Sequence, residues 1–166
     1  MIRLAEAKDM DRLLEIYAIA RGFMAETGNG GQWGDNYPPR KLIEEDIEAQ
    51  RLYVNTEEQD GAIHGVFMFS LGDDPTYDYI EGAWKKDGPY GVIHRVASDG
   101  SRKGLFNDCL AYCKDRTDNI RIDTHEQNLV MQHVLSKNGF KKCGVIYVRD
   151  NSPRLAYQYV AGELHT

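Results

Sequence analysis

The strongest constraint on the fold lies between residues 91 and 114, where the chain reads "GVIHRVASDGSRKGLFNDCLAYCK". An apolar run stops at a short segment with two glycines and two cations, and an amphipathic pattern begins directly after it. Short apolar runs are typical of buried strands, and the spacing that follows is typical of a helix. The sequence therefore predicts a strand, a glycine-containing loop and a helix in direct succession.

This succession of elements suits a phosphate group. The first turn of a helix leaves backbone N–H groups unpaired, and the helix dipole adds partial positive charge at the same end. Glycines let the backbone approach an anion closely, and Arg102 and Lys103 add positive charge. The segment "GSRKGLF" lacks the GxxxxGK[ST] of a Walker A loop, and a Rossmann fingerprint follows the first strand of the chain, whereas this loop follows a much later one. A coenzyme A cradle and an ordinary loop with solvated cations stay open.

The remaining pattern predicts one mixed α/β domain over residues 1–166. Before the loop we expect strands at 2–6, "RLYVNTE", "AIHGVFMFSLG", "YDYIEGAW" and "VIHRVA", and helices at 9–25 and "RKLIEEDIEA". After it we expect a helix at 102–116, a strand at 119–123, a helix at 127–138, a strand at 141–148 and a last strand near "LAYQYV". An antiparallel meander followed by strand–helix–strand–helix–strand gives one sheet with helices on its faces.

Composition narrows the classes of partner. The net charge of −6 argues against nucleic acid and suits a cationic, amine-bearing partner. No segment has the roughly 18 consecutive apolar residues of a membrane span, and the first residues are charged throughout, so we expect no membrane contact and a cytoplasmic location. Cys109, Cys113 and Cys143 form no CxxC, which argues against a disulfide framework, and Cys109 and Cys113, four apart in a helical pattern, are expected to be small buried apolar side chains rather than metal ligands.

The second half of the chain holds two motifs, "SRKGLF" and "NLVMQHVLSKNGF", which resemble those of the GNAT N-acetyltransferase superfamily. The usual loop pattern is Q/R-x-x-G-x-G/A, and "SRKGLF" supplies its central glycine at Gly104, with Ser101 and Phe106 at the outer places. The second motif is usually N-x-x-A-x-x-x-Y-x-x-x-G-F. The segment "NLVMQHVLSKNGF" keeps its asparagine, glycine and phenylalanine but has Met131 and Leu135 at the small and tyrosine positions. Element order is similar over nearly the whole chain.

The resemblance implies a mostly antiparallel sheet flanked by helices, with a V-shaped opening for acyl-CoA between the fourth and fifth strands. It also implies direct transfer of an acetyl group from acetyl-CoA to a primary amine of a small molecule or peptide. The pyrophosphate would lie on backbone amides of the loop, and the pantetheine along the fourth strand. The implied coenzyme contacts are Arg95, Val96, Ala97, Gly100, Ser101, Arg102, Lys103, Gly104, Leu105, Phe106 and Asn128.

The resemblance implies three candidates for the base that deprotonates the amine. Asp123 stands five residues before the motif asparagine, where several family members have Glu or His, and His94 and Glu81 are the alternatives. Asp123 could equally cap the next helix, and Asn128 could do the same. Leu135 cannot act as the general acid; Tyr147 or Tyr90 could substitute, and the acid stays unassigned. The N–H of Val96 would stabilise the thioester oxyanion.

Substrate binding is expected at the glycine-rich segment "GNGGQWGDNYPP", where Trp33 and Tyr37 could close over an amine, with Trp84 on the opposite wall. An aromatic pair that anchors this loop to the body is the competing interpretation. No metal is expected, and a homodimer stays open. Two other functions compete with acetyl transfer: a non-catalytic acyl-CoA-binding or sensing module, which Leu135 favours, and an unrelated nucleotide-binding α/β protein.

Overall fold

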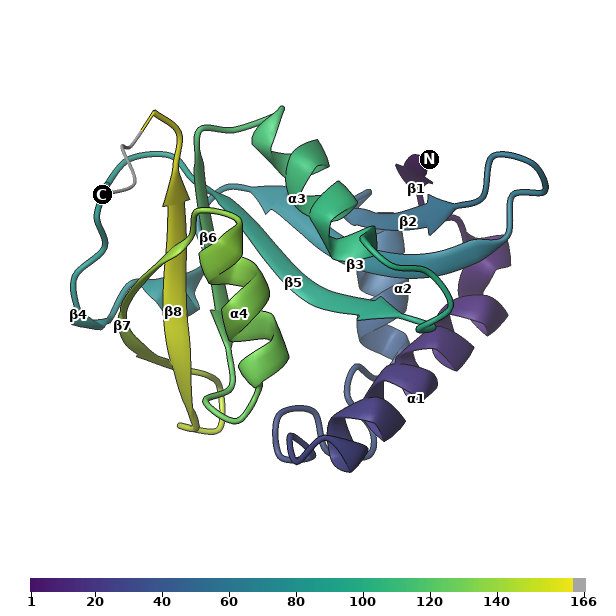
Figure 1. Cartoon of the computed structure of the whole chain (residues 1–166), viewed down its shortest axis with the longest axis horizontal. Coiled ribbons are helices and arrows are strands. Elements are labelled where there is room, and N and C mark those ends of the chain that lie inside the picture. Colours follow the sequence, from purple (N-terminus) through teal and green to yellow (C-terminus); the bar gives the residue numbers. More distant parts are fainter. Residues whose placement is uncertain (163–166) are drawn as a thin grey trace. The chain divides into compact units, whose positions relative to one another are not determined.

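The computed structural model describes residues 1–162, which form eight strands, four α-helices and two short 3₁₀ turns (Figure 1). The strands are β1 (Ile2–Leu4), β2 (Leu52–Thr56), β3 (Ile63–Leu71), β4 (Glu81–Gly82), β5 (Gly91–Ser98), β6 (Asn119–Thr124), β7 (Lys141–Tyr147) and β8 (Pro153–Val160). The helices are α1 (Met10–Glu26), α2 (Arg40–Glu48), α3 (Leu105–Lys114) and α4 (Leu129–Lys137). The predicted mixed α/β fold with a mostly antiparallel sheet is confirmed.

The described chain divides into two compact units. Unit 1 comprises Met1–Phe69 and His94–Tyr112, and unit 2 comprises Ser70–Ile93 and the chain from Cys113 onward. Strand β5 and helix α3 contribute residues to both units. The single domain over residues 1–166 stays a prediction. None of the helices within residues 1–162 combines the length and the apolar character needed to cross a membrane.

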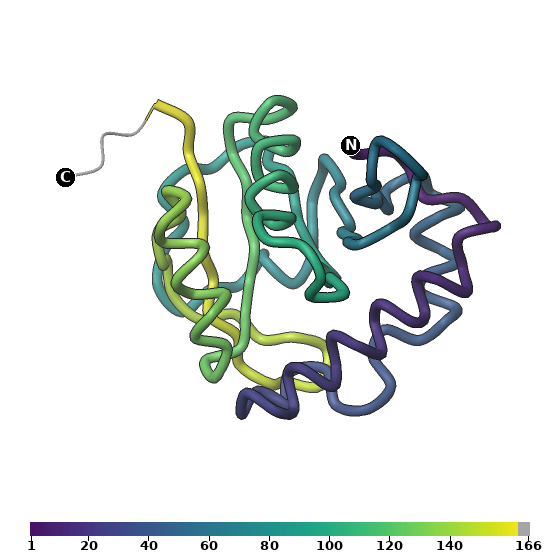
Figure 2. Tube along the Cα trace, turned by 45° about the vertical axis from the view of Figure 1, so that its right-hand side comes forward, coloured from purple at the N-terminus to yellow at the C-terminus, as the bar shows by residue number. Residues whose placement is uncertain are grey.

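Unit 1 is a layered structure built on strands in the order β1, β2, β3 and β5. Alternation along β2 sends Leu52 and Val54 into a core shared with Leu13 and Ile16 of α1, because successive strand residues face opposite sides. Tyr53 lies on the other face, where it contacts the rings of Phe67 and of Tyr112 in α3. Helix α1 thus packs on one face of β2, and α3 on the other (Figure 2).

Unit 2 contains strands in the order β5, β6, β8, β7 and β4, of which the start of β5 belongs to this unit. The pairing of β5 with β6 is parallel and covers Gly91 with Ile120 and Val92 with Arg121. Strand β8 then pairs antiparallel with both β6 and β7. Tyr77, Tyr90, Val92, Ile146 and Ala156 form a buried apolar cluster in this unit. The predicted opening beside the fourth main strand stays a prediction.

One predicted strand is wrong. The segment "YDYIEGAW" begins at the end of a 3₁₀ turn, Pro75–Tyr77, and only Glu81 and Gly82 form a strand. That strand, β4, pairs with Val145 and Gly144 of β7, at the edge of the unit 2 sheet rather than beside β5. The side chain of Asp74 accepts a hydrogen bond from the N–H of Thr76 and so stabilises the turn. Tyr77 and Trp84 of the segment pack into the core, whereas Tyr79 is exposed, so the aromatic residues do not alternate as they would along a strand.

The cysteine prediction is confirmed for the residues described. Cys109 and Cys113 are buried in α3 and Cys143 on β7 is half-buried, and none of the three forms a disulfide within residues 1–162. Both helical cysteines act as small apolar side chains in the packing of α3.

Candidate active site

The loop between β5 and α3 has the backbone expected of a cradle. Gly100 and Gly104 have φ of +78° and +81°, in the left-handed region that favours glycine. A Cβ at either position would meet no atom within 4 Å, so the backbone of the loop is openly accessible. Helix α3 begins at Leu105, directly after Gly104. The sequence predicted the helix start three residues too early, because the loop extends through Gly104.

Asp99 organises this loop through its side chain. Its carboxylate accepts hydrogen bonds from the Ser101 N–H at 2.9 Å, from the Ser101 hydroxyl at 2.6 Å and from Arg12 at 2.6 Å. Nδ1 of His64 lies 2.8 Å from the same carboxylate. Burial alone would raise the pKa of Asp99, but the hydrogen bonds from Ser101 and His64 outweigh it and lower the pKa from 3.8 to about 2. The Ser101 N–H, predicted to face a pyrophosphate, is therefore already partnered.

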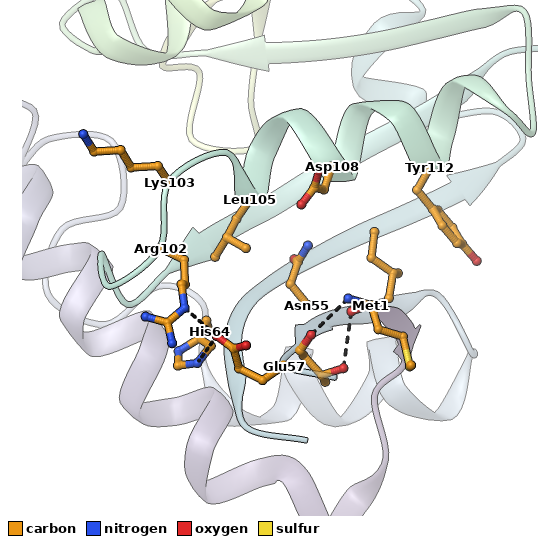
Figure 3. A pocket seen from close by; sticks show the side chains of 11 residues that line it. Met1, Asn55, Glu57, His64, Arg102, Lys103, Leu105, Asp108 and Tyr112 are labelled. Atoms are coloured by element: carbon orange, nitrogen blue, oxygen red, sulfur yellow. Dashed lines mark hydrogen bonds and ion pairs between the residues drawn. The ribbon is translucent and has the colours of Figure 1, made fainter. Parts of the chain in front are cut away.

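The two cations of the loop differ in their surroundings. Arg102 forms an ion pair with Glu57, which also lies 3.4 Å from Nε2 of His64. Lys103 is exposed, and its side chain extends away from this group (Figure 3). Both cations, with Leu105 of α3, line a cavity of about 540 Å³. Lys103 is thus the loop cation directed toward solvent.

Strand β5 is fixed to the rest of unit 1 at Arg95. This residue has φ of +52°, a conformation that costs a non-glycine residue about 1–3 kcal/mol. Its guanidinium donates to both oxygens of Asp46, at 2.6 and 2.8 Å, and its carbonyl accepts a hydrogen bond from Tyr17 at 2.9 Å. Burial would lower the pKa of Arg95, but the hydrogen bond and charge of Asp46 raise it above its usual value. The side chain of Arg95 is committed to Asp46; Val96 and Ala97 follow it on β5.

The aromatic pair of the glycine-rich segment is anchored to unit 1. Trp33 lies between Tyr17 and Tyr37, with ring centroids 5.8 and 5.9 Å apart. The Tyr37 hydroxyl lies 3.3 Å from Nη1 of Arg95, which donates to it. These contacts are the ones expected if the aromatic pair anchors the glycine-rich loop to the body of unit 1. They also place the predicted acceptor loop against a residue of the predicted coenzyme strand.

Asp123 lies on β6 of unit 2 and has a buried partner. The hydroxyl of Tyr77 donates to Oδ2 of Asp123 at 2.7 Å, and Tyr77 is only 1% exposed. Burial, followed by the charge and hydrogen bond of Asp123, raises the pKa of Tyr77 well above 10. The alternative that Asp123 caps α4 is wrong, because Asn128 is the N-cap and its side chain accepts from the Met131 N–H at 3.1 Å.

The other predicted base candidates have different settings. His94 is half-buried on β5. Glu81 is exposed on β4, where it accepts a hydrogen bond from the Tyr147 hydroxyl at 2.8 Å. Trp84, predicted to line a substrate wall, packs against the ring of Tyr77 and donates its indole N–H to the Tyr77 carbonyl. Trp84 therefore supports the partner of Asp123.

The tyrosine position of the second motif is fully apolar. Leu135 is 0% exposed and belongs to the interior of unit 2. Of the two tyrosines proposed as substitutes, Tyr147 is bonded to Glu81. The hydroxyl of Tyr90 lies 2.8 Å from the N–H of Asp74, from which it accepts. Both hydroxyls thus have structural partners.

Sequence reasoning missed the partners in these networks, among them His64 for Asp99, Asp46 for Arg95 and Tyr77 for Asp123. The only local signal was the Asp–Gly–Ser order at 99–101, which is typical of a turn in which Asp accepts from the N–H two residues later. The three partners lie 35, 49 and 46 residues from Asp99, Arg95 and Asp123, so no local pattern predicts them.

Solved structures similar to this chain fix its family. A GNAT-family acetyltransferase from Streptococcus agalactiae 2603 is 32% identical, with a TM-score of 0.85, over 98% of this chain and 96% of that one. This chain belongs to the GNAT family of acetyltransferases. A GNAT-family acetyltransferase from Listeria monocytogenes 4b F2365 is 18% identical, with a TM-score of 0.70, over 96% and 94% of the two chains. A putative acetyltransferase from Salmonella typhimurium, solved with its cofactor acetyl-CoA, is 18% identical, with a TM-score of 0.65, over 100% of this chain and 96% of that one.

No protein-family model and no curated protein matches the sequence. Within the described part of the GNAT chain, residues 1–162, no three His, Cys, Asp or Glu side chains come together in a way that could hold a metal ion.

Proposed function

We propose that this protein transfers an acetyl group from acetyl-CoA to a primary amine of a small molecule or peptide. The observation that carries the proposal is the 32% identity, over 98% of the chain, to a GNAT-family acetyltransferase. The acetyl-CoA bound by the Salmonella typhimurium protein of similar fold supports the choice of acyl donor. Acetyl-CoA supplies an acyl group already activated as a thioester.

The loop of unit 1 fits the pyrophosphate of this donor. Gly100 and Gly104 leave the backbone open to close approach, and the first N–H groups of α3 follow at once. Lys103 adds a positive charge at the rim. We assign the pyrophosphate to the amides of residues 102–106, since the Ser101 N–H is held by Asp99. Backbone groups of Val96 and Ala97 would pair with the pantetheine, and Asn128 would contact the coenzyme.

The proposed reaction is a direct displacement. The ammonium of the acceptor gives one proton to Asp123, and the resulting amine attacks the thioester carbonyl carbon. The N–C bond forms, the N–H of Val96 stabilises the oxyanion, and the C–S bond breaks. The sulfur leaves as a thiolate, which takes up the second proton, lost by the nitrogen as the amide forms. The thiolate of a thiol with a pKa of about 8.5 is a tolerable leaving group without a positioned acid.

The acceptor amine would be recognised by the aromatic residues of unit 1. Trp33 and Tyr37 lie on the segment before α2, and the contact of Tyr37 with Arg95 ties that segment to β5. The net charge of −6 favours a cationic acceptor through long-range attraction. Trp84 acts indirectly in this proposal, through Tyr77.

The proposal is tested first by a thermal-shift titration with acetyl-CoA, CoA and ATP in parallel. A ligand at 100 times its dissociation constant stabilises the folded state by about 2.7 kcal/mol, which raises the melting temperature by several degrees. We expect stabilisation by acetyl-CoA and CoA. A protein that responds to ATP alone, or to none of the three at millimolar concentration, would contradict the proposal.

The second candidate function is a non-catalytic acyl-CoA-binding or sensing module. The buried Leu135, in place of the usual tyrosine, is the observation that favours it. Both functions predict coenzyme binding, and turnover separates them. Release of CoA that depends on spermidine, glucosamine or the peptide Ala-Lys-Ala would support the transferase and exclude the sensor.

A further inference from the structure

The buried hydroxyl of Tyr77 has a defined target in unit 2. It donates to Oδ2 of Asp123 at 2.7 Å from a side chain that is almost completely shielded from solvent. We propose that Tyr77 is a positioning residue that fixes the orientation of the Asp123 carboxylate toward the acceptor amine. The inference rests on the proposed function, in which Asp123 is the base.

The backbone and ring of Tyr77 are themselves held in place. Trp84 donates its indole N–H to the Tyr77 carbonyl at 3.0 Å, and the two rings meet edge to face with centroids 5.3 Å apart. The ring of Tyr90 lies 6.3 Å away on another side. The Tyr90 hydroxyl accepts from the N–H of Asp74, at the start of the turn that carries Tyr77. Two aromatic residues therefore fix both the turn and the ring.

Arg121 completes this support. Its guanidinium carbon lies 4.2 Å from the centroid of the Trp84 ring and 4.1 Å from that of Tyr90. Nη2 of Arg121 also donates to the carbonyl of Lys86 at 3.1 Å. Cation–π contacts are strongest when they are shielded from water, and Arg121 is only 5% exposed. Arg121 thus holds the two aromatic side chains that hold Tyr77.

The contacts that hold Tyr77 in place start and end on strand β6. Arg121 and Asp123 are two residues apart on β6, so their side chains leave the same face of the strand. Arg121 packs against Trp84 and Tyr90, and these pack against Tyr77, which returns to Asp123. Rotation of the Asp123 side chain would break a hydrogen bond inside a closed set of contacts. This makes one orientation of the carboxylate strongly preferred.

Tyr77 cannot itself be the missing acid. Its ring is buried, and burial together with the negative charge of Asp123 raises its pKa well above the usual 10, so the phenol keeps its proton. A phenol that stays protonated is a permanent hydrogen-bond donor. This is the property that a positioning residue needs, because the donor stays available to Oδ2 of Asp123 throughout the reaction.

The test is the kinetics of Tyr77→Phe, with acetyl-CoA and the fastest of three amine probes: spermidine, glucosamine and Ala-Lys-Ala. Loss of a hydrogen bond to a charged group corresponds to roughly a tenfold to hundredfold fall in kcat. We expect this fall with an unchanged KM for acetyl-CoA. The matched control is Tyr157→Phe, which removes the hydroxyl of another buried tyrosine on the neighbouring strand β8 and should leave kcat unchanged. Wild-type kcat in Tyr77→Phe would overturn the inference.

A double-mutant cycle with Asp123→Asn separates this inference from the proposed function. If Tyr77 acts through Asp123, Tyr77→Phe should lower kcat in the wild type and have little further effect in Asp123→Asn. A large fall in Asp123→Asn with no fall in Tyr77→Phe overturns the positioning role alone. Full activity of Asp123→Asn, or no turnover by the wild type with any probe, overturns the proposed chemistry itself.

A second variant covers the case in which Tyr77→Phe unfolds. Trp84→Phe keeps an aromatic ring but removes the indole N–H that binds the Tyr77 carbonyl. We expect a fall in kcat of a few-fold, smaller than that of Tyr77→Phe, with an unchanged KM for acetyl-CoA. Unchanged kcat in Trp84→Phe, in a protein that melts at the wild-type temperature, would also overturn the inference.

Discussion

Replacing Asp99 by asparagine tests whether the loop before α3 is held by charge. The substitution keeps an oxygen that can accept from the Ser101 N–H, but it removes the negative charge that faces Arg12 and His64. The Asp99 side chain is 9% exposed, so its interactions are only weakly screened by solvent. We therefore expect Asp99→Asn, which replaces one carboxylate oxygen by an NH2 group, to lower the free energy of unfolding clearly.

The pKa of Asp99 gives the magnitude and the sign. A fall from 3.8 to about 2 corresponds to about 2 kcal/mol of stability at neutral pH. Because the pKa is lower in the folded state, this stability is complete well above pH 3.8 and is lost as the pH falls through 2. About half of it is lost by pH 3. The asparagine side chain in Asp99→Asn does not titrate, so the difference between the wild type and this variant should shrink as the solution becomes more acidic.

The assay is urea unfolding of both proteins at pH 7, 5 and 3, with stability from linear extrapolation. The matched control is Asp150→Asn, since Asp150 accepts from the Ser152 N–H at 3.0 Å in the same local arrangement but is exposed. We expect only a small change in the control at every pH. A stability difference for Asp99→Asn that stays constant or grows toward pH 3 would refute the reasoning, as would an equal effect in the control.

Three further substitutions have expected outcomes. Asp46→Asn leaves the Arg95 guanidinium buried without its counter-charge and should cost about 3–5 kcal/mol in urea unfolding, whereas a loss under about 1 kcal/mol would contradict the ion pair. Gly104→Ala places a side chain at φ +81° and should weaken the binding of acetyl-CoA, as measured by calorimetry. The control Gly61→Ala, at φ +74° in an exposed segment, should leave that binding unchanged. Leu135→Ala should destabilise by about 2–5 kcal/mol, and a loss below about 1 kcal/mol would show that the site is not tightly packed.

Much of the fold could be predicted because its elements carry their own periodicity. The strand, loop and helix at 91–114, and the elements that follow, appear within a few residues of their predicted bounds. The segment at 77–84 could not be predicted in this way. Its aromatic residues have the composition of a strand, but Tyr77 and Trp84 are placed by contacts with each other and with Arg121. Tertiary packing decided the structure there.

The candidate site, like the fold, could be predicted from the sequence only in part. Local sequence predicted the glycines of the loop and left the cap of α4 open between Asp123 and Asn128; the structure assigns it to Asn128. What could not be predicted is the set of partners that hold each functional group, because His64 and Tyr77 come from distant parts of the chain. A residue type names a chemical capacity, but its orientation depends on neighbours that only folding brings together.

The contacts of the candidate residues explain why no positioned general acid is assigned. Leu135 is buried and apolar, Tyr90 and Tyr147 have structural partners, and Tyr77 keeps its proton for Asp123. The reaction that we propose therefore depends on the leaving ability of the thiolate. A positioned acid typically raises the reaction rate by about 10²–10⁴-fold. This contribution matters less for a thiolate, whose conjugate acid has a pKa of about 8.5, than for a more basic leaving group. In this proposal the chain itself contributes the base oriented by Tyr77, the loop held by Asp99 and the Val96 N–H at the oxyanion, without a positioned acid.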